Sequence, residues 1–267
     1  FMNIDNYSKN GYIIIKNAVA KELIYTVQNE ILKKAYNKKK IKNNYTNFTK
    51  IFEKTINSKL FDLINPINKH LFNENIITKI LHQKKIIECI TMLLGRDLAV
   101  TAESSLTINL PDSKKNYYYK DWHQEIWSGA SISHIQIWTP IFQKTSIDGQ
   151  IGFIKDSHKW GHIPHMDRKP VELPDNFSTI KSNLQIGDVL IFSTTLLHKT
   201  IPAKHPRLGL TMTVKNFRYN DYSFSDNINW KIFSYSEITK IQRILGNHYL
   251  SPFRLSDEKT KTKIEIN

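Results

Sequence analysis

Leu208-Gly-Leu-Thr-Met-Thr-Val214 alternates large apolar residues with glycine and threonine, and this period of two predicts a β-strand with one apolar face. Ser133-His-Ile-Gln-Ile-Trp138 alternates in the same way. Around them lie short β-rich runs bounded by Pro, Gly, Asp and Asn, at 98–109, 134–142, 150–154, 189–193 and 208–217. Many short strands without helices between them predict an antiparallel sandwich or barrel, in preference to a parallel doubly wound sheet.

Helical patterns flank the β-rich region on both sides. Leu23, Val27 and Ile31 form one stripe at four-residue spacing, which predicts a helix over 20–37. A second apolar stripe predicts a helix over 76–94, and Gly95 is its C-terminal stop. The remaining expectations are an early strand over 11–16, a polar irregular segment with room for short helical stretches over 41–75, and a late helix over 236–246 stopped by Gly246.

The layout predicts a single domain over residues 1–267, mainly β with flanking helices. A helical N-terminal part (about 1–95) precedes a β core (about 96–220), and a helical appendix (about 221–267) follows. Hydrophobic residues make up 40% of the chain, which excludes a disordered protein. No apolar run reaches the roughly 20 residues that a membrane helix needs, so we expect no membrane span.

The formal net charge is +14, from 38 Lys and Arg against 24 Asp and Glu. The lysines are scattered, so we interpret the charge as a solvated basic surface and not as a nucleic-acid groove; such a surface steers a small anionic substrate inward. Cys89 is the single cysteine, which excludes a disulfide framework and a Cys-rich zinc site. With no signal-like start, we expect a cytoplasmic protein; the sequence predicts no oligomeric state.

Three residues suggest a metal site: His123, Glu125 and His198. In an extended segment His123 and Glu125 point to the same face, because side chains alternate along a strand. A second imidazole from a distant strand, His198, completes a 2-His-1-carboxylate facial triad of the kind that holds Fe(II) with open positions. A His-x-Glu pair alone is a weak signal, but flanking tryptophans indicate an aromatic-walled pocket.

An arginine near the distal histidine extends the site. His198 follows the apolar run 187–192, and Arg207 opens the next strand after a Pro-containing loop. A strand histidine beside an arginine suits a dicarboxylate such as 2-oxoglutarate, whose far carboxylate a guanidinium binds as a bidentate pair.

The ordered set of motifs resembles the phytanoyl-CoA-hydroxylase-like (PhyH) family of Fe(II)/2-oxoglutarate dioxygenases, over about residues 7–220. The matching segments are Gly11-Tyr-Ile-Ile-Ile-Lys-Asn17, Asp121-Trp-His-Gln-Glu-Ile-Trp127, Trp138-Thr-Pro-Ile-Phe142, Gly149-Gln-Ile-Gly-Phe-Ile-Lys-Asp-Ser-His-Lys-Trp-Gly161, Gly187-Asp-Val-Leu-Ile-Phe192 to His198, and Pro206-Arg207.

The resemblance implies a double-stranded β-helix (jelly-roll, cupin-like) core and O2-dependent hydroxylation of a small, anionic metabolite. It implies that His123, Glu125 and His198 bind Fe(II) and that Arg207 anchors 2-oxoglutarate. Two further positions, Asn109 and Thr200, match cosubstrate contacts of the family.

The chain departs from the family pattern in three places. Glu125 stands where the family usually has Asp; it remains an anionic oxygen ligand, which disfavours a halogenase. The loop between His198 and Arg207 is shorter than usual, and Lys155-Asp-Ser-His158 replaces Pro-Gly-Ser-His. Two alternatives stay open: a cupin-like metal enzyme that uses no 2-oxoglutarate, and a non-catalytic jelly-roll binding protein.

Another histidine group lies at 158, 162 and 165. Gly161 and Pro164 interrupt any helix that would align these three imidazoles, so we expect them to border the pocket mouth and not to form a second metal site.

Overall fold

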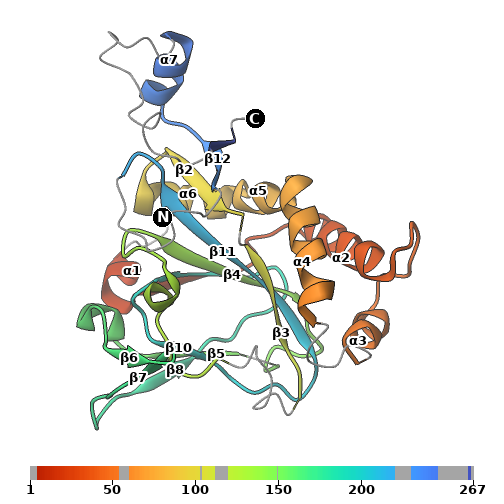
Figure 1. Cartoon of the computed structure of the whole chain (residues 1–267), viewed down its shortest axis with the longest axis horizontal. Coiled ribbons are helices and arrows are strands. Elements are labelled where there is room, and N and C mark those ends of the chain that lie inside the picture. Colours follow the sequence, from red (N-terminus) through yellow and green to blue (C-terminus); the bar gives the residue numbers. More distant parts are fainter. Residues whose placement is uncertain are drawn as a thin grey trace.

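Two mainly antiparallel sheets dominate the computed structural model, which describes residues 5–53, 60–102, 104–111, 120–148, 150–219, 230–245 and 264–265 (Figure 1). The larger sheet has the strand order β1 (Tyr12–Ile15), β9 (Val189–Ser193), β4 (Ile135–Phe142), β11 (Arg207–Asn216), β2 (Leu98–Thr101), β12 (Trp230–Ser234) and β13 (Ile264–Glu265), with β3 (Ser105–Asn109) also paired to β11. The smaller sheet has the order β10 (His198–Thr200), β5 (Ile151–Ile154) and β8 (Thr179–Lys181).

Most helices precede the strands in the chain. The described helices are α1 (Asp5–Asn10), α2 (Lys21–Tyr36), α3 (Tyr45–Glu53), α4 (Leu60–Asn73), α5 (Ile76–Leu81), α6 (Lys84–Leu94) and, after the strands, α7 (Glu237–Leu245). Of these, α2, α4, α5 and α6 lie along one face of the larger sheet (Figure 1). Two 3-10 turns, η3 (Glu125–Ser128) and η4 (Ser157–Trp160), and a hairpin of β6 (His165–Met166) and β7 (Lys169–Pro170) complete the described elements. None of the described helices is both long enough and apolar enough to cross a bilayer.

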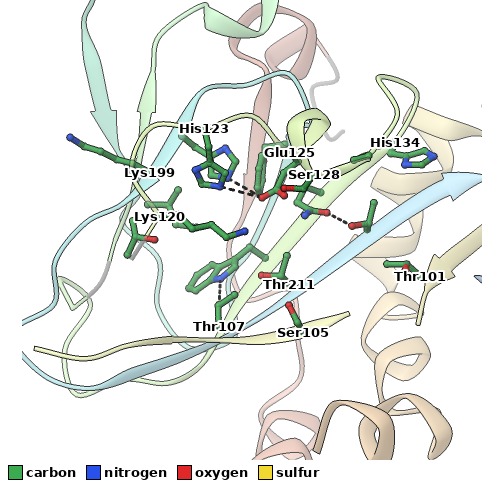
Figure 2. Close-up of a pocket in the computed structure, with 18 of the residues that line it drawn as sticks. Thr101, Ser105, Thr107, Lys120, His123, Glu125, Ser128, His134, Lys199 and Thr211 are labelled. Carbon is green, nitrogen blue, oxygen red and sulfur yellow. Dashed lines mark hydrogen bonds and ion pairs between the residues drawn. The ribbon is translucent and has the colours of Figure 1, made fainter. Parts of the chain in front are cut away.

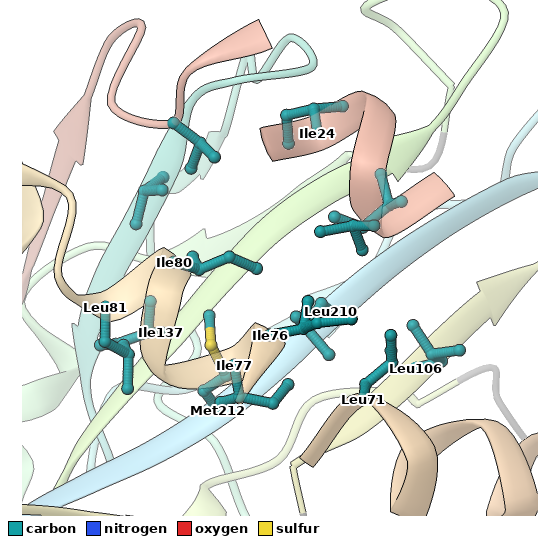
Figure 3. Close-up of a cluster of buried hydrophobic side chains, with 14 of the residues drawn as sticks. Ile24, Leu71, Ile76, Ile77, Ile80, Leu81, Leu106, Ile137, Leu210 and Met212 are labelled. Atoms are coloured by element: carbon teal, nitrogen blue, oxygen red, sulfur yellow. The ribbon is translucent and has the colours of Figure 1, made fainter. Parts of the chain in front are cut away.

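Strand β11 confirms the prediction made from its alternation. It pairs antiparallel with β4, β3 and β2, and its register against β4 shifts between Leu208 and Gly209. Its large apolar residues are fully buried: Leu208, Leu210, Met212 and Val214 are each 0% exposed. Figure 3 shows Leu210 and Met212 meeting side chains of the helical layer such as Ile76 and Ile77. The main hydrophobic core therefore lies between the larger sheet and the helices.

The other face of the larger sheet looks toward the smaller sheet. Thr211 and Thr213, which alternate with the buried residues of β11, line the cavity on this side. One strand pattern thus supplies both layers, because successive side chains of a strand point to opposite faces. The antiparallel jelly-roll core expected from the sequence is confirmed.

The helical predictions succeed in part. Helix α2 confirms the expected helix, but Ile24, Val27, Ile31 and Leu32 are its buried residues, so the buried stripe is rotated from the one predicted. The single helix expected over 76–94 is wrong: the chain turns at His82, where the imidazole Nδ1 bonds the carbonyl of Thr78, and α6 starts after Gln83. Gly95 ends α6 as predicted, with φ 83° and its N–H donating to Thr91.

Two segments hold more regular structure than the sequence analysis expected. The region 41–75 contains α3 and α4, and α4 buries Leu60, Ile64, Ile67 and Leu71 although Pro66 lies inside it. In the appendix, α7 confirms the expected late helix, but β12 joins the larger sheet by pairing with β2. The appendix is therefore not purely helical. The stop predicted at Gly246 lies outside the described residues.

Candidate metal centre

A backbone bridge brings the two histidines of the predicted triad together. The N–H of each residue, His123 and His198, donates to the carbonyl of the other at 3.0 Å, as in an antiparallel pair. Their ring centroids are 4.1 Å apart. His198 begins β10, which is held by β5, so the smaller sheet fixes its position.

Glu125 reaches the same point from the start of η3. Gln124 between the two ligand candidates is extended, with φ −111° and ψ 144°, as the same-face argument requires, and the chain turns at Glu125. The fully buried Gln124 side chain points elsewhere: its amide donates to the carbonyls of Thr195 and Gly161, and its oxygen accepts from the N–H of Ile163. Gln124 therefore fastens the segment and holds its two neighbours toward the cavity.

The three side chains are buried and converge. One ligand atom from each of His123, Glu125 and His198 lies within 4.8 Å of the others. Glu125 Oε1 is 3.6 Å from His123 Nε2 and 3.2 Å from His198 Nε2 (Figure 2). The exposed fractions are only 6%, 9% and 5%. Among the described residues this is the one cluster of His, Cys, Asp and Glu that can hold a metal ion.

Hydrogen bonds behind the rings orient both imidazoles. His123 Nδ1 lies 2.7 Å from the carbonyl oxygen of Asp121, and His198 Nδ1 lies 2.9 Å from that of Leu196. A carbonyl only accepts, so each Nδ1 carries the proton and each Nε2 offers a lone pair to the cavity. Backbone carbonyls behind metal-binding histidines commonly fix ring orientation in this way.

The electrostatics of the cluster favour a bound cation. Burial, aided by the neighbouring His198, lowers the pKa of His123 to about 4, so this ring is neutral at pH 7. Burial alone would raise the pKa of Glu125, but Lys120 and the two imidazoles hold that pKa well below its usual value. The buried His123 Nε2 has no hydrogen-bond partner in the described chain. Two lone pairs and a carboxylate oxygen facing one another repel unless a cation lies between them, and this donor set suits Fe(II).

Arg207 lines the same cavity as the three metal-ligand candidates. It is 4% exposed, its Nη1 donates to the carbonyl of Asp148 at 3.0 Å, and its guanidinium lies 4.2 Å from the ring centre of Trp138. Burial lowers the pKa of Arg207 to about 9, with Asp148 opposing, so it stays charged at pH 7. The Asp148 carboxylate bonds His205 and Thr145, not the guanidinium.

The six predicted site residues line one cavity of about 260 Å³. Asn109 and Arg207 are register partners on β3 and β11, and Thr200 lies two residues after His198 on β10. Sequence reasoning missed two further cations on the cavity wall, Lys120 and Lys199. Lys120 could have been found, because it immediately precedes the motif of 121–127. It also left the direction of Gln136 open; this side chain lines the cavity.

The second histidine group does not converge. His158 Nε2 lies 3.0 Å from the carbonyl of Ser8, and its ring packs where a side chain on Gly11 would stand. His165 stacks on Trp127, with ring centroids 4.8 Å apart. Among the described residues, the histidines at 158, 162 and 165 form no cluster that could hold a metal ion.

Comparison with solved structures shows the fold. The chain is similar to the apo form of the non-heme monooxygenase ThoJ, with a TM-score of 0.62 at 14% identity over 87% of this chain and 84% of that one. The ThoJ–nickel complex gives a TM-score of 0.54 at 14% identity over 87% and 83%. The epimerase SnoN in complex with Fe3+, α-ketoglutarate and nogalamycin RO gives 0.50 at 11% identity over 79% and 81%.

Comparison with curated protein sequences found no significant match. The family model described as phytanoyl-CoA dioxygenase (PhyH) matches residues 7–207, which is most of the chain and spans the triad and Arg207. The chain therefore belongs to the phytanoyl-CoA dioxygenase (PhyH) family of oxygenases.

Proposed function

We propose that the protein is a non-haem Fe(II)- and 2-oxoglutarate-dependent dioxygenase that hydroxylates an unactivated C–H bond of a small metabolite. The observation that carries the proposal is the convergence of two proton-free imidazole nitrogens and one carboxylate oxygen on a single buried point. Family membership supports the same reaction class. The structural neighbour SnoN is described in complex with Fe3+ and α-ketoglutarate, which agrees with this choice of metal and cosubstrate.

In this proposal His123, Glu125 and His198 hold the metal. Bound iron, together with 2-oxoglutarate and O2, supplies the oxidising power that an unactivated C–H bond requires. The protein contributes position and charge. The Nδ1–H bonds to the carbonyls of Asp121 and Leu196 keep both Nε2 atoms free for the metal. Burial of all three ligands keeps bulk water from competing.

Arg207 binds the far carboxylate of 2-oxoglutarate. Among the described residues the buried Arg207 guanidinium bonds one carbonyl, so it retains several N–H donors, and a carboxylate satisfies two of them side by side. Asn109, its register partner, and Thr200 lie on the same cavity wall and are the candidates for further polar contacts to the cosubstrate. A metal enzyme that uses no 2-oxoglutarate has no need for this buried cation, which is why we prefer the dioxygenase to the cupin-like alternative.

The test is succinate formation from 2-oxoglutarate with Fe(II) and O2. We expect the wild-type protein to form succinate slowly without substrate, and His198→Ala to form none. Arg207→Ala should bind the metal normally but need roughly ten- to a hundredfold more 2-oxoglutarate, because one bidentate charged contact is lost. Lys204→Ala, an exposed cation in the same loop, is the matched control and should behave as wild type. Absence of succinate from the iron-loaded wild type would refute the proposal and favour a binding protein.

A further inference from the structure

The cavity extends past the triad into a region walled by hydroxyl and amide side chains, which we call the hydroxyl lobe. Its members come from four strands of the larger sheet: Thr101 on β2, Ser105 and Thr107 on β3, Gln136 on β4, and Thr211 and Thr213 on β11. Figure 2 shows Thr101, Ser105 and Thr211 on one side of the cavity and Lys199 on the other. Lys199 therefore lies apart from the lobe, whereas Thr107 borders the Trp138 indole that carries the Arg207 guanidinium.

The polarity of the lobe is not forced by the fold. The same strands carry large aliphatic residues on their other face, where Leu106, Ile137 and Leu210 are buried under the helices. Aliphatic residues at the inward positions would keep the same strand propensity, since β-branched Val fits a strand as well as Thr does. The same fold could therefore present an aliphatic wall to an apolar ligand, but this protein has hydroxyl side chains at those positions.

Several groups of the lobe have unused hydrogen-bonding capacity. Thr213 donates to Gln136 Oε1 at 2.6 Å, and Trp138 Nε1 donates to Thr107 Oγ1 at 3.1 Å. Among the described residues no other partner meets these two side chains, so the Gln136 amide N–H groups and the Thr107 hydroxyl proton are free to donate. Within the described chain, the hydroxyls of Ser105 and Thr211 have no protein partner. The lobe therefore presents donors and acceptors to whatever fills it.

An occupant must satisfy these groups or lose affinity. An apolar occupant that displaces water leaves each one unpaired, which weakens binding by roughly five- to a hundredfold per group. The six lobe side chains include no lysine, arginine, aspartate or glutamate, so a charged group would find no ion-pair partner among them; the charged residues of the cavity line other parts of its wall. We propose that the hydroxyl lobe binds a neutral, polyhydroxylated part of the substrate, such as a sugar ring or a polyol. The assignment rests on the proposed function in that the lobe opens onto the triad.

Ligand-observed NMR with the full-length protein tests this directly. The probes are an equimolar mixture of the methyl glycosides of glucose, galactose and mannose, and decanoate as the apolar comparison. We expect saturation transfer to the ring protons of at least one glycoside and none to the decanoate chain. Transfer to decanoate alone, or to no probe, would overturn the assignment.

Two variants locate the binding. Thr211→Val keeps the shape and removes one hydroxyl, and Ser105→Ala removes another with little change in volume. Each should weaken glycoside binding by about three- to tenfold, the effect of one neutral hydrogen bond. Met212→Leu, on the helix-facing side of the same strand, is the matched control and should leave binding unchanged. Wild-type affinity in both lobe variants would contradict the assignment.

The binding readout needs no turnover, so the two proposals fail separately. A protein that binds glycosides but forms no succinate from 2-oxoglutarate contradicts the dioxygenase proposal and leaves the lobe assignment standing. One that forms succinate but binds no glycoside contradicts the lobe assignment alone.

Discussion

Gly209→Ala should disturb the cosubstrate end of the cavity without touching the metal ligands. A Cβ at this position would lie 2.2 Å from Trp138 Cζ2, 2.4 Å from Cε2 and 2.6 Å from Nε1. Carbon atoms in ordinary contact are about 3.5–4.0 Å apart, so the indole must move by more than about 1 Å. The indole bonds Thr107 and carries the Arg207 guanidinium on its face, so both contacts change when it moves.

The expected size follows from these contacts. Overpacking of this kind costs about 1–3 kcal/mol of folding free energy. Misplacing the guanidinium forfeits up to one bidentate charged contact, or about 1.5–3 kcal/mol, which weakens 2-oxoglutarate binding roughly ten- to a hundredfold. Titration calorimetry of 2-oxoglutarate into metal-loaded protein measures this effect, and metal affinity, measured separately, should stay at the wild-type value.

A second substitution distinguishes the collision from a general loss of folding. Phenylalanine is smaller than tryptophan and lacks Cζ2, the indole atom nearest the new Cβ, yet keeps an aromatic face for Arg207. Gly209→Ala/Trp138→Phe should therefore bind 2-oxoglutarate more tightly than Gly209→Ala alone. Wild-type affinity and melting temperature in Gly209→Ala would refute the reasoning, because they would show that the indole position does not matter.

Three further predictions concern the metal and the fold. His123→Ala should lose most of the bound metal, measured by elemental analysis after dialysis; full occupancy would exclude His123 as a ligand. Glu125→Asp should keep metal and partial succinate formation because the oxygen donor remains, whereas Glu125→Ala should lose turnover; equal rates in these two variants would argue against a ligand role. Asp188 accepts hydrogen bonds from Lys16 and from the N–H groups of Asn17 and Gln185. Burial opposes its ionisation, but these bonds lower the pKa of Asp188. Its stabilisation is therefore full above the unfolded pKa of about 3.9 and is lost as the pH falls through the lower folded value. Asp188→Ala should cost about 2–4 kcal/mol at pH 7 and less at pH 3, by urea denaturation; a pH-independent cost would contradict this.

Local patterns predicted the strands and the His123–Glu125 pair because both depend on short spacings, whereas His198 joins the pair from a distant strand. The alternation in 208–214 is visible without knowing which strands pair with it. His123 and Glu125 share a face because the residue between them is extended. The break between α5 and α6 was not predictable in this way, since the apolar stripe continues across His82. The His82 imidazole bonds the Thr78 carbonyl at the end of α5 and also contacts the carbonyl of the distant Phe233. In the 41–75 region the sequence analysis predicted too little helix. Pro66 and the many polar residues obscured the helical pattern of α4, whose buried apolar residues pack on the sheet.

The contacts that complete the site are long-range, and they explain what sequence reasoning could not reach. Trp138 and Gly209 lie on the neighbouring strands β4 and β11 and contact each other. Whether Gln136 points into the cavity or into the core depends on which face of the sheet the helices cover. The positions of Asn109 and Thr200 on the cavity wall follow from strand pairing. Their roles, and that of Arg207 toward 2-oxoglutarate, stay predictions.

The placement of the main hydrophobic core outside the space between the two sheets has an evolutionary consequence. The residues that hold the fold together, such as Leu210 and Met212, point away from those that meet a ligand, such as Thr211 and Thr213. Mutation at the inward positions can therefore retune which molecule is accepted while folding stability is left nearly intact. A scaffold arranged in this way can acquire new substrates through single substitutions on one face of a strand, without compensating changes on the other.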